Sequence, residues 1–93
     1  MPDFLSKEDV LADVLSKMTS AEDIFALFED MFTTREIRDM NSRFNVAVLL
    51  NEGKTYNEVE KETGASPTTI ARVNKCLTSG SGGYSKALTV FGK

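Results

Sequence analysis

The chain has 93 residues, 41% of them hydrophobic, and a formal net charge of -3, which limits it to a single small domain. One cysteine, Cys76, and no histidine exclude a disulfide framework and a Cys/His zinc site within one chain, so we expect a reducing compartment and no metal or cofactor. No apolar run approaches the ~18 residues needed to cross a bilayer, and Met1-Pro2-Asp3 lacks the basic start of a secretory signal, so we expect a cytoplasmic protein with no membrane partner.

The first predicted helix follows Ser6. The side-chain oxygen of this serine can accept from amide groups that the first turn of a helix leaves without partners. Apolar residues then recur at helical spacing from Val10 to Met18, and we expect the helix to end near Thr19.

The second predicted helix is apolar around much of its circumference. It begins at the cap Ser20, with Asp23 at the capping-box position. Its apolar residues are Ile24, Phe25, Leu27, Phe28, Met31 and Phe32. Two interpretations remain open, a helix inside the monomer and a helix buried between two subunits. The small chain has more apolar helices than one core can cover, which favours a dimer.

The third predicted helix is the longest, near residues 34 to 51. Thr33 with Glu36 forms a Thr-x-x-Glu capping box at its start. Gly53 can end it in the left-handed conformation, which costs glycine no steric strain.

Residues 55 to 77 have the pattern of a helix-turn-helix. Such a unit needs a short helix, a glycine at the sharp turn and a second helix that packs on the first. A second Thr-x-x-Glu box, Thr55 with Glu58, begins the short helix, and Gly64 follows it at the turn. The spacing of Val59, Ile70 and Val73 places these three side chains where the two helices must touch.

The other side of the second helix of this unit suits DNA chemically. Threonine hydroxyls can bind bases or phosphates, small apolar side chains can contact thymine methyls, and cations can meet phosphates. The candidate DNA-binding residues, which we call the reading face, are Ser66, Pro67, Thr68, Thr69, Ala71, Arg72 and Lys75. The same pattern also occurs in helical bundles that never meet DNA, so a protein-interaction module without operator binding is the alternative.

Charge is distributed unevenly along the chain. Residues 1 to 30 hold eight acidic and two basic side chains, a net charge of -6, whereas residues 66 to 93 hold four basic side chains and no acid. A basic reading face on an acidic body and a soluble surface with uneven charge both fit this distribution.

Residues 79 to 83, Ser-Gly-Ser-Gly-Gly, predict a hinge or a disordered link. Residues 84 to 93 predict a short tail that is either a docking segment or a frayed end. The expected layout is one helical domain over 1–78, with dimerising helices over about 7–51 and the helix-turn-helix over 55–77. No repeat and no strand is expected.

From Thr33 to Leu77 the sequence resembles the Trp repressor family, in particular its uncharacterised bacterial relatives. The stretches that carry the resemblance are Leu49-Leu50-Asn51-Glu52-Gly53, Glu62-Thr63-Gly64-Ala65 and Thr69-Ile70-Ala71-Arg72. The resemblance implies an all-α fold and an intertwined homodimer, whose recognition helices enter successive major grooves of double-stranded DNA one helical turn apart. It therefore implies a transcription regulator.

The resemblance also implies a candidate effector pocket. In that family a tryptophan corepressor is held by a threonine and two arginines, which Thr33, Arg43 and Arg72 match here. Val73 replaces a glycine and Cys76 a serine, and a β-branched side chain would intrude on the indole. Tryptophan is therefore not the expected effector, and three alternatives remain open: a smaller small-molecule effector, a different anion, and no ligand at all.

Two further points concern charged residues in the part of the chain that resembles this family. The two arginines of the candidate pocket have another interpretation, in which they pair with acids such as Asp39 or stay solvated. The family's basic phosphate contacts fall on Asn57 and Glu60 here, so we expect weak, less salt-sensitive DNA binding unless Lys54, Lys61 or the basic tail compensates.

An enzyme is not expected. The chain has no histidine and no glycine-rich phosphate loop, and its single thiol, Cys76, is more typical of a small buried filler than of a nucleophile. A redox-sensing thiol at a subunit interface is the other interpretation of this cysteine.

Overall fold

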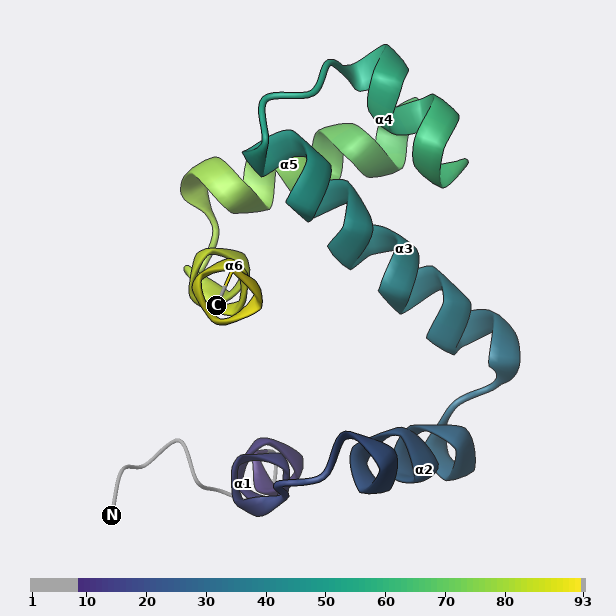
Figure 1. Ribbon diagram of the computed structural model, residues 1–93, viewed down its shortest axis with the longest axis vertical. Coiled ribbons are helices and arrows are strands. Elements are labelled where there is room, and N and C mark those ends of the chain that lie inside the picture. The colour runs from purple at the N-terminus through teal and green to yellow at the C-terminus, as the bar shows by residue number, and fades with distance from the viewer. Residues whose placement is uncertain (1–8, 93) are drawn as a thin grey trace. The chain divides into compact units, whose positions relative to one another are not determined.

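The computed structural model describes residues 9–92, which form six helices and no strand (Figure 1). The helices are α1 (Val10–Lys17), α2 (Ala21–Met31), α3 (Thr34–Asn51), α4 (Tyr56–Thr63), α5 (Pro67–Ser79) and α6 (Gly83–Phe91). The chain divides into two compact units, Met1–Ile37 and Arg38–Lys93. The expectation of an all-helical protein is confirmed.

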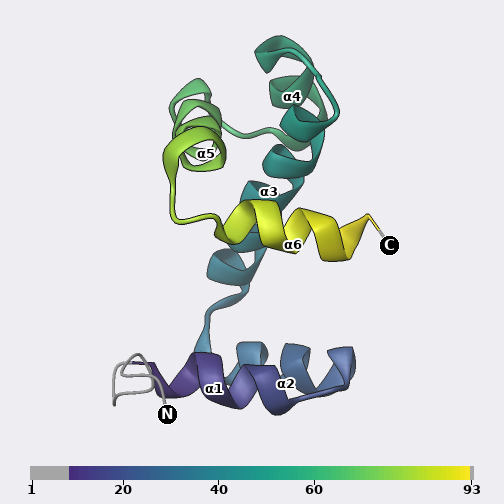
Figure 2. The ribbon, with the colours of Figure 1, turned by 90° about the vertical axis from the view of Figure 1, so that its left-hand side faces the viewer.

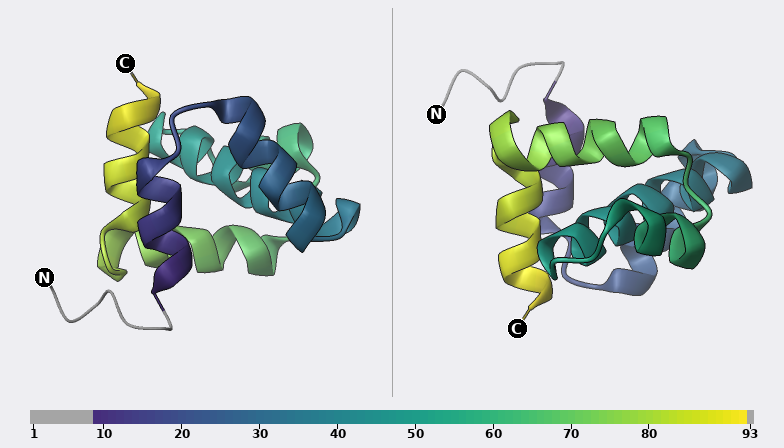
Figure 3. Two further views of the ribbon diagram at one scale, coloured as in Figure 1. Left: turned by 90° about the horizontal axis from the view of Figure 1, so that it is seen from below. Right: turned by 90° about the horizontal axis from the view of Figure 1, so that it is seen from above.

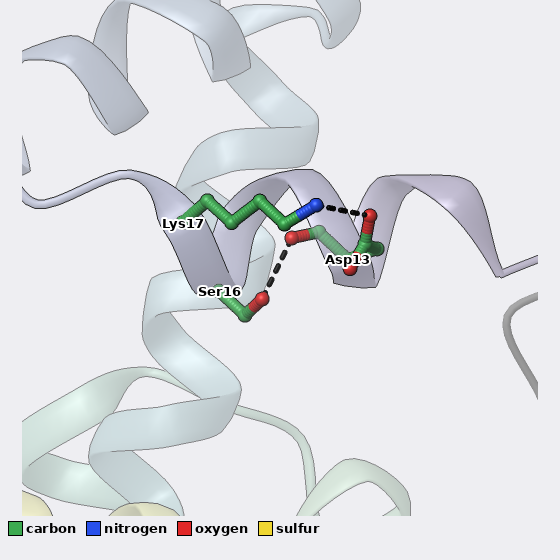
Figure 4. A network of polar contacts seen from close by, with 3 residues as sticks. All are labelled: Asp13, Ser16 and Lys17. Carbon is green, nitrogen blue, oxygen red and sulfur yellow. Dashed lines mark hydrogen bonds and ion pairs between the residues drawn. The ribbon is translucent and has the colours of Figure 1, made fainter. Parts of the chain in front are cut away.

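The first unit contains α1 and α2, and neither helix has a buried residue. The predicted cap of α2 is present, because Ser20 Oγ accepts from the amide of Asp23 at 3.2 Å. The predicted cap of α1, Ser6, lies outside the described residues, within which α1 begins at Val10. At the end of α1, Lys17 Nζ lies 3.1 Å from Asp13 Oδ2, a surface pair of little energetic weight (Figure 4).

Both predicted ends of the long helix α3 are confirmed. At its start, the amide of Thr33 donates to Glu36 Oε1 at 2.9 Å and the amide of Glu36 donates to Thr33 Oγ1 at 3.1 Å. At its end, Gly53 has a φ of 89°. The amide of Lys54 then donates to the carbonyl of Leu49 at 3.1 Å, which satisfies a carbonyl that the helix itself leaves free.

The core lies in the second unit. It is built from Val46 and Ala47 of α3, Val59 of α4, and Ile70 and Val73 of α5, all at most 3% exposed. Figure 3 shows α5 running between the turn from α4 and the start of α6. A core of five medium and small side chains is modest, so single changes in it are expected to be costly.

Helix α6 is a feature that sequence analysis missed. Its start has no side-chain cap, and Gly82 before it has a φ of 89°. The helix is held instead by tertiary contacts, because Tyr84 and Leu88 pack against the core and the rings of Phe44 and Phe91 meet edge to face at 5.8 Å. In Figure 2 it crosses α3. Packing therefore overrides the poor local helix propensity of a Gly-Gly start.

The link between α5 and α6 gives a stability prediction. A methyl group added at Gly80 would collide with the carbonyl oxygen of Cys76, whereas one added at Gly83 would meet nothing within 4 Å. Gly80→Ala is therefore expected to lower the free energy of unfolding by about 1–3 kcal/mol. Gly83→Ala, the matched control, is expected to raise it by roughly 0.4–1 kcal/mol. Urea unfolding measures both, and equal stability of Gly80→Ala and the unmodified protein would contradict the geometry.

The capping box of α4 gives a prediction for acid stability. The amide of Thr55 donates to Glu58 Oε1 at 2.9 Å, and this backbone bond, with the Thr55 hydroxyl next in importance, holds the pKa of Glu58 below its ordinary value. Because the pKa is lower in the folded state, the carboxylate stabilises the fold above the unfolded value of about 4.3 and this stabilisation is lost as the pH falls through the folded value. When the pH is lowered through this range, the free energy of unfolding of Glu58→Gln is expected to fall less than that of the control Glu60→Gln, which replaces an exposed glutamate of the same helix. Urea unfolding at successive pH values measures both.

Candidate DNA-reading helix and the adjoining pocket

The turn between α4 and α5 is fixed by local hydrogen bonds (Figure 1). Gly64 has a φ of 75° and donates its amide to the carbonyl of Glu60 at 2.9 Å. Thr63 Oγ1 donates to the carbonyl of Val59 at 2.8 Å and accepts from the amide of Ala65 at 3.1 Å. Since a left-handed residue is needed at Gly64, a side chain there would strain the turn.

The predicted contact between the two helices of this unit is confirmed. Val59 of α4 is fully buried, and Ile70 and Val73 of α5 are 1% and 3% exposed. The inner side of α5 therefore belongs to the core, and the orientation of the helix is set by that packing.

The reading face lies on the free side of α5. Ser66 caps the helix, with its Oγ accepting from the amide of Thr69 at 3.2 Å, and Pro67 occupies the first helical position. The exposed members of the reading face are Ser66, Pro67, Thr68, Ala71, Arg72 and Lys75, and Thr69 is partly buried. Among residues 9–92 neither Arg72 nor Lys75 makes an ion pair. The face therefore offers hydroxyl and methyl groups in the first turns of α5 and two cations without ion pairs further along the same helix.

A pocket of about 370 Å³ adjoins this face, at the side of α5 next to α3. The pocket, which we call the arginine pocket, is lined by Arg43, Thr68, Thr69, Arg72, Val73, Cys76 and Tyr84. Its volume is within the range of small-molecule sites. Four of the five residues expected in an effector pocket thus lie together.

The fifth expected residue, Thr33, belongs to the first unit, where both its amide and its hydroxyl bind Glu36. Val73 lines the arginine pocket while packed in the core, so it narrows the space without closing it. The expectation that Cys76 is a buried filler is wrong, because its side chain is exposed and lines the pocket.

Sequence analysis did not find Tyr84 as a pocket residue. It assigned this tyrosine to the tail, and no local motif connects it with Arg72. Tyr84 lines the pocket because α6 turns back onto the core and carries the half-buried phenol to the side of α5. An aromatic side chain with a polar tip is well suited to such a boundary between core and solvent.

The charged side chains that line the arginine pocket are all basic. Arg43 and Arg72 both line it, and no carboxylate does. The spacing of Asp39 and Arg43 would allow an ion pair along α3, yet none forms among the described residues. The structure therefore supports the interpretation in which these two arginines stay solvated, and not the one in which they form ion pairs.

The family model described as Trp repressor protein matches residues 6–90. The chain belongs to the Trp repressor family. The uncharacterized protein YerC of Bacillus subtilis (strain 168) is 40% identical over 80 residues, which cover 86% of this chain and 77% of YerC.

Two solved structures of similar proteins support the Trp repressor fold. A TrpR-like protein from Eubacterium eligens ATCC 27750 has a TM-score of 0.85 and 32% identity, over 98% of this chain and 96% of that one. A candidate Trp repressor from Staphylococcus aureus has a TM-score of 0.85 and 30% identity, over 99% and 96% of the two chains. The resemblance inferred from the sequence is therefore confirmed.

Membership in the Trp repressor family also confirms that the protein is not an enzyme, because this family consists of regulatory DNA-binding proteins. Among the described residues, no helix is long and apolar enough to cross a membrane.

Proposed function

We propose that the protein is a sequence-specific, DNA-binding transcription regulator that acts as a homodimer, with α5 as its recognition helix. The observation that carries this proposal is the division of α5 into two sides. Its inner side is locked into the core by Ile70 and Val73, while the reading face is exposed and carries two cations without ion pairs. A rigid helix with a free polar side is what major-groove recognition requires.

The residues of the reading face take different roles in this proposal. Thr68 and Ala71 are placed to meet base edges, where a hydroxyl and a methyl group can distinguish bases. Arg72 and Lys75 neutralise phosphates, which supplies affinity without sequence information. The amides at the start of α5 can add a phosphate contact.

The homodimer is supported by the first unit. Its helices expose large apolar side chains, with Val10 54%, Phe25 47% and Met31 49% exposed. Exposed apolar surface of this kind is costly in water and is typical of a subunit interface. We infer that the helices up to residue 51 form an intertwined dimer, which presents two copies of α5 to successive major grooves.

Selection from a pool of random-sequence duplexes at low salt tests the function. We expect an enriched palindromic site whose half-sites lie one helical turn, about 10 base pairs, apart. Thr68→Ala is expected to change the bases selected, whereas Thr78→Ala, at the other end of α5, is the matched control. Recovery of no enriched site would instead support the alternative of a protein-interaction module, for which the exposed Glu60 on α4 is the favourable observation.

We propose further that a small ligand other than tryptophan regulates the protein through the arginine pocket. The pocket shares Thr68, Thr69 and Arg72 with the reading face, so a ligand there touches the residues that DNA would use. The buried Val73, at the position where the family has glycine, argues against an indole in the same space.

A further inference from the structure

We propose that the arginine pocket binds a small phosphate-bearing anion, and that the bound anion weakens the binding of DNA. This proposal deepens the proposed function, since it names the class of ligand and the direction of its effect. Its second half rests on the proposed function, whereas its first half concerns the pocket alone.

The charges lining the pocket select for an anion. Arg43 comes from α3 and Arg72 from α5, and neither has an ion-pair partner among the described residues. No carboxylate lines the pocket, and Cys76 stands where the family has a serine, so the ammonium group of a free amino acid would find neither a countercharge nor that hydroxyl there. A ligand with net negative charge is therefore favoured over a zwitterion.

The hydroxyl groups favour phosphate over a carboxylate. Thr68, Thr69 and Tyr84 line the same pocket as the two arginines. Ser66 Oγ lies 3.1 Å from Thr69 Oγ1 and donates to it, which leaves the Thr69 proton free for a ligand. The two guanidinium groups and the three hydroxyls make five donor groups, more than the two oxygens of a carboxylate can accept. The three terminal oxygens of a phosphate can accept from all of them. The guanidinium group also binds phosphate in a bidentate manner.

The apolar part of the pocket favours a ligand that also has a carbon chain. Val73 is 3% exposed and forms a rigid wall, and the half-buried ring of Tyr84 lines the side that α6 contributes. Together with Cys76 they form an apolar side of the pocket that can contact a short carbon chain. The ligand class is therefore a small organic phosphate.

The effect on DNA follows from the shared residues. Thr68, Thr69 and Arg72 line the pocket and also belong to the reading face. An anion bound to them occupies their donors and places negative charge next to the site of the DNA phosphates. The bound anion repels the DNA phosphates, and Arg72 can no longer neutralise the DNA backbone. The anion is therefore expected to act as an inducer, which releases DNA.

The first arm of the test measures binding of the anion alone. Inorganic phosphate and glycerol 3-phosphate are titrated by calorimetry against the full chain, with glycerol and L-tryptophan as the neutral and zwitterionic probes. We expect both phosphates to bind, and Arg43→Gln to weaken them at least tenfold. Arg38→Gln, which removes an exposed arginine of α3 that does not line this pocket, is expected to change the affinity less than twofold. Equal effects of the two variants, or tryptophan binding as tightly as glycerol 3-phosphate, would overturn the proposal.

The second arm measures DNA affinity by fluorescence anisotropy at constant ionic strength, with and without saturating glycerol 3-phosphate. We expect the anion to weaken DNA binding at least fivefold in the unmodified protein and in Arg38→Gln, and to have no effect in Arg43→Gln. Unchanged or tighter DNA binding would overturn the inducer role. If the pocket instead holds a phosphate of the DNA itself, Arg43→Gln weakens DNA binding and lowers its salt dependence without added anion, which also overturns the proposal.

The two arms separate this inference from the proposed function. If no duplex binds at any salt concentration, the regulator function fails and the inducer role fails with it, while the first arm still decides whether the pocket is a phosphate site. If DNA binds but neither phosphate does, the regulator stands and the inference fails.

Discussion

Phe25→Glu is expected to convert the proposed dimer into a monomer that is largely unfolded at 25 °C. Phe25 lies on α2, a helix without a single buried residue, and is itself 47% exposed in one chain. If a second copy covers it, truncation of such an aromatic costs about 3–5 kcal/mol per subunit, and burial of an unpaired carboxylate adds to this cost. Obligate homodimers often have no stable folded monomer, so dissociation and unfolding are expected together.

Sedimentation equilibrium and thermal unfolding at several concentrations measure this effect. The unmodified protein is expected to sediment as a dimer, with a melting temperature that rises with concentration. Glu29→Gln, a change on an exposed residue of the same helix, serves as the control and is expected to behave like the unmodified protein. A melting temperature that is independent of concentration and is unaffected by Phe25→Glu would show that α2 does not form the interface.

Arg72→Gln is expected to have the largest effect on DNA binding among changes on the reading face. The side chain is exposed in the middle of α5 and makes no ion pair among the described residues. Removal of one charge-assisted hydrogen bond to a phosphate costs about 1.5–3 kcal/mol, a factor of roughly ten to a hundred in affinity. The slope of log affinity against log salt is also expected to fall by about 0.9 for each phosphate that the protein no longer neutralises.

Anisotropy titrations over a range of salt concentrations with a selected operator measure both quantities. Arg72→Lys keeps the charge without the planar fork and is expected to recover the salt slope but only part of the affinity. Arg38→Gln, on the polar side of α3, is the matched control for removal of an arginine. If Arg72→Gln binds the operator as tightly as the control does, α5 is not the recognition helix.

Local signals predicted most of the helix boundaries. The capping boxes at Thr33 and Thr55 and the left-handed glycines Gly53 and Gly64 are properties of a few neighbouring residues, and each is present in the structure. Such signals can be identified in a sequence because the atoms involved are close together along the chain. These local signals predicted the positions of α4, the turn and α5, and therefore of the reading face.

Residues far apart in the sequence were harder to connect. Helix α6 has a Gly-Gly start that predicts no helix, and it exists because Tyr84 and Leu88 pack on the core. The exposure of Cys76 was predicted wrongly for the same reason, since which side of α5 faces the core depends on how α3, α4 and α6 pack around it.

By itself, then, the sequence determined the order of the helices up to residue 79, the helix-turn-helix and the family, because caps, turn glycines and apolar spacing act within a few residues. The resemblance to the family already grouped Arg43 with Arg72, whereas only the tertiary structure added Tyr84 to the pocket and showed that both arginines are without acidic partners among the described residues. Charge balance in a pocket depends on which side chains packing brings together, and no local pattern encodes that.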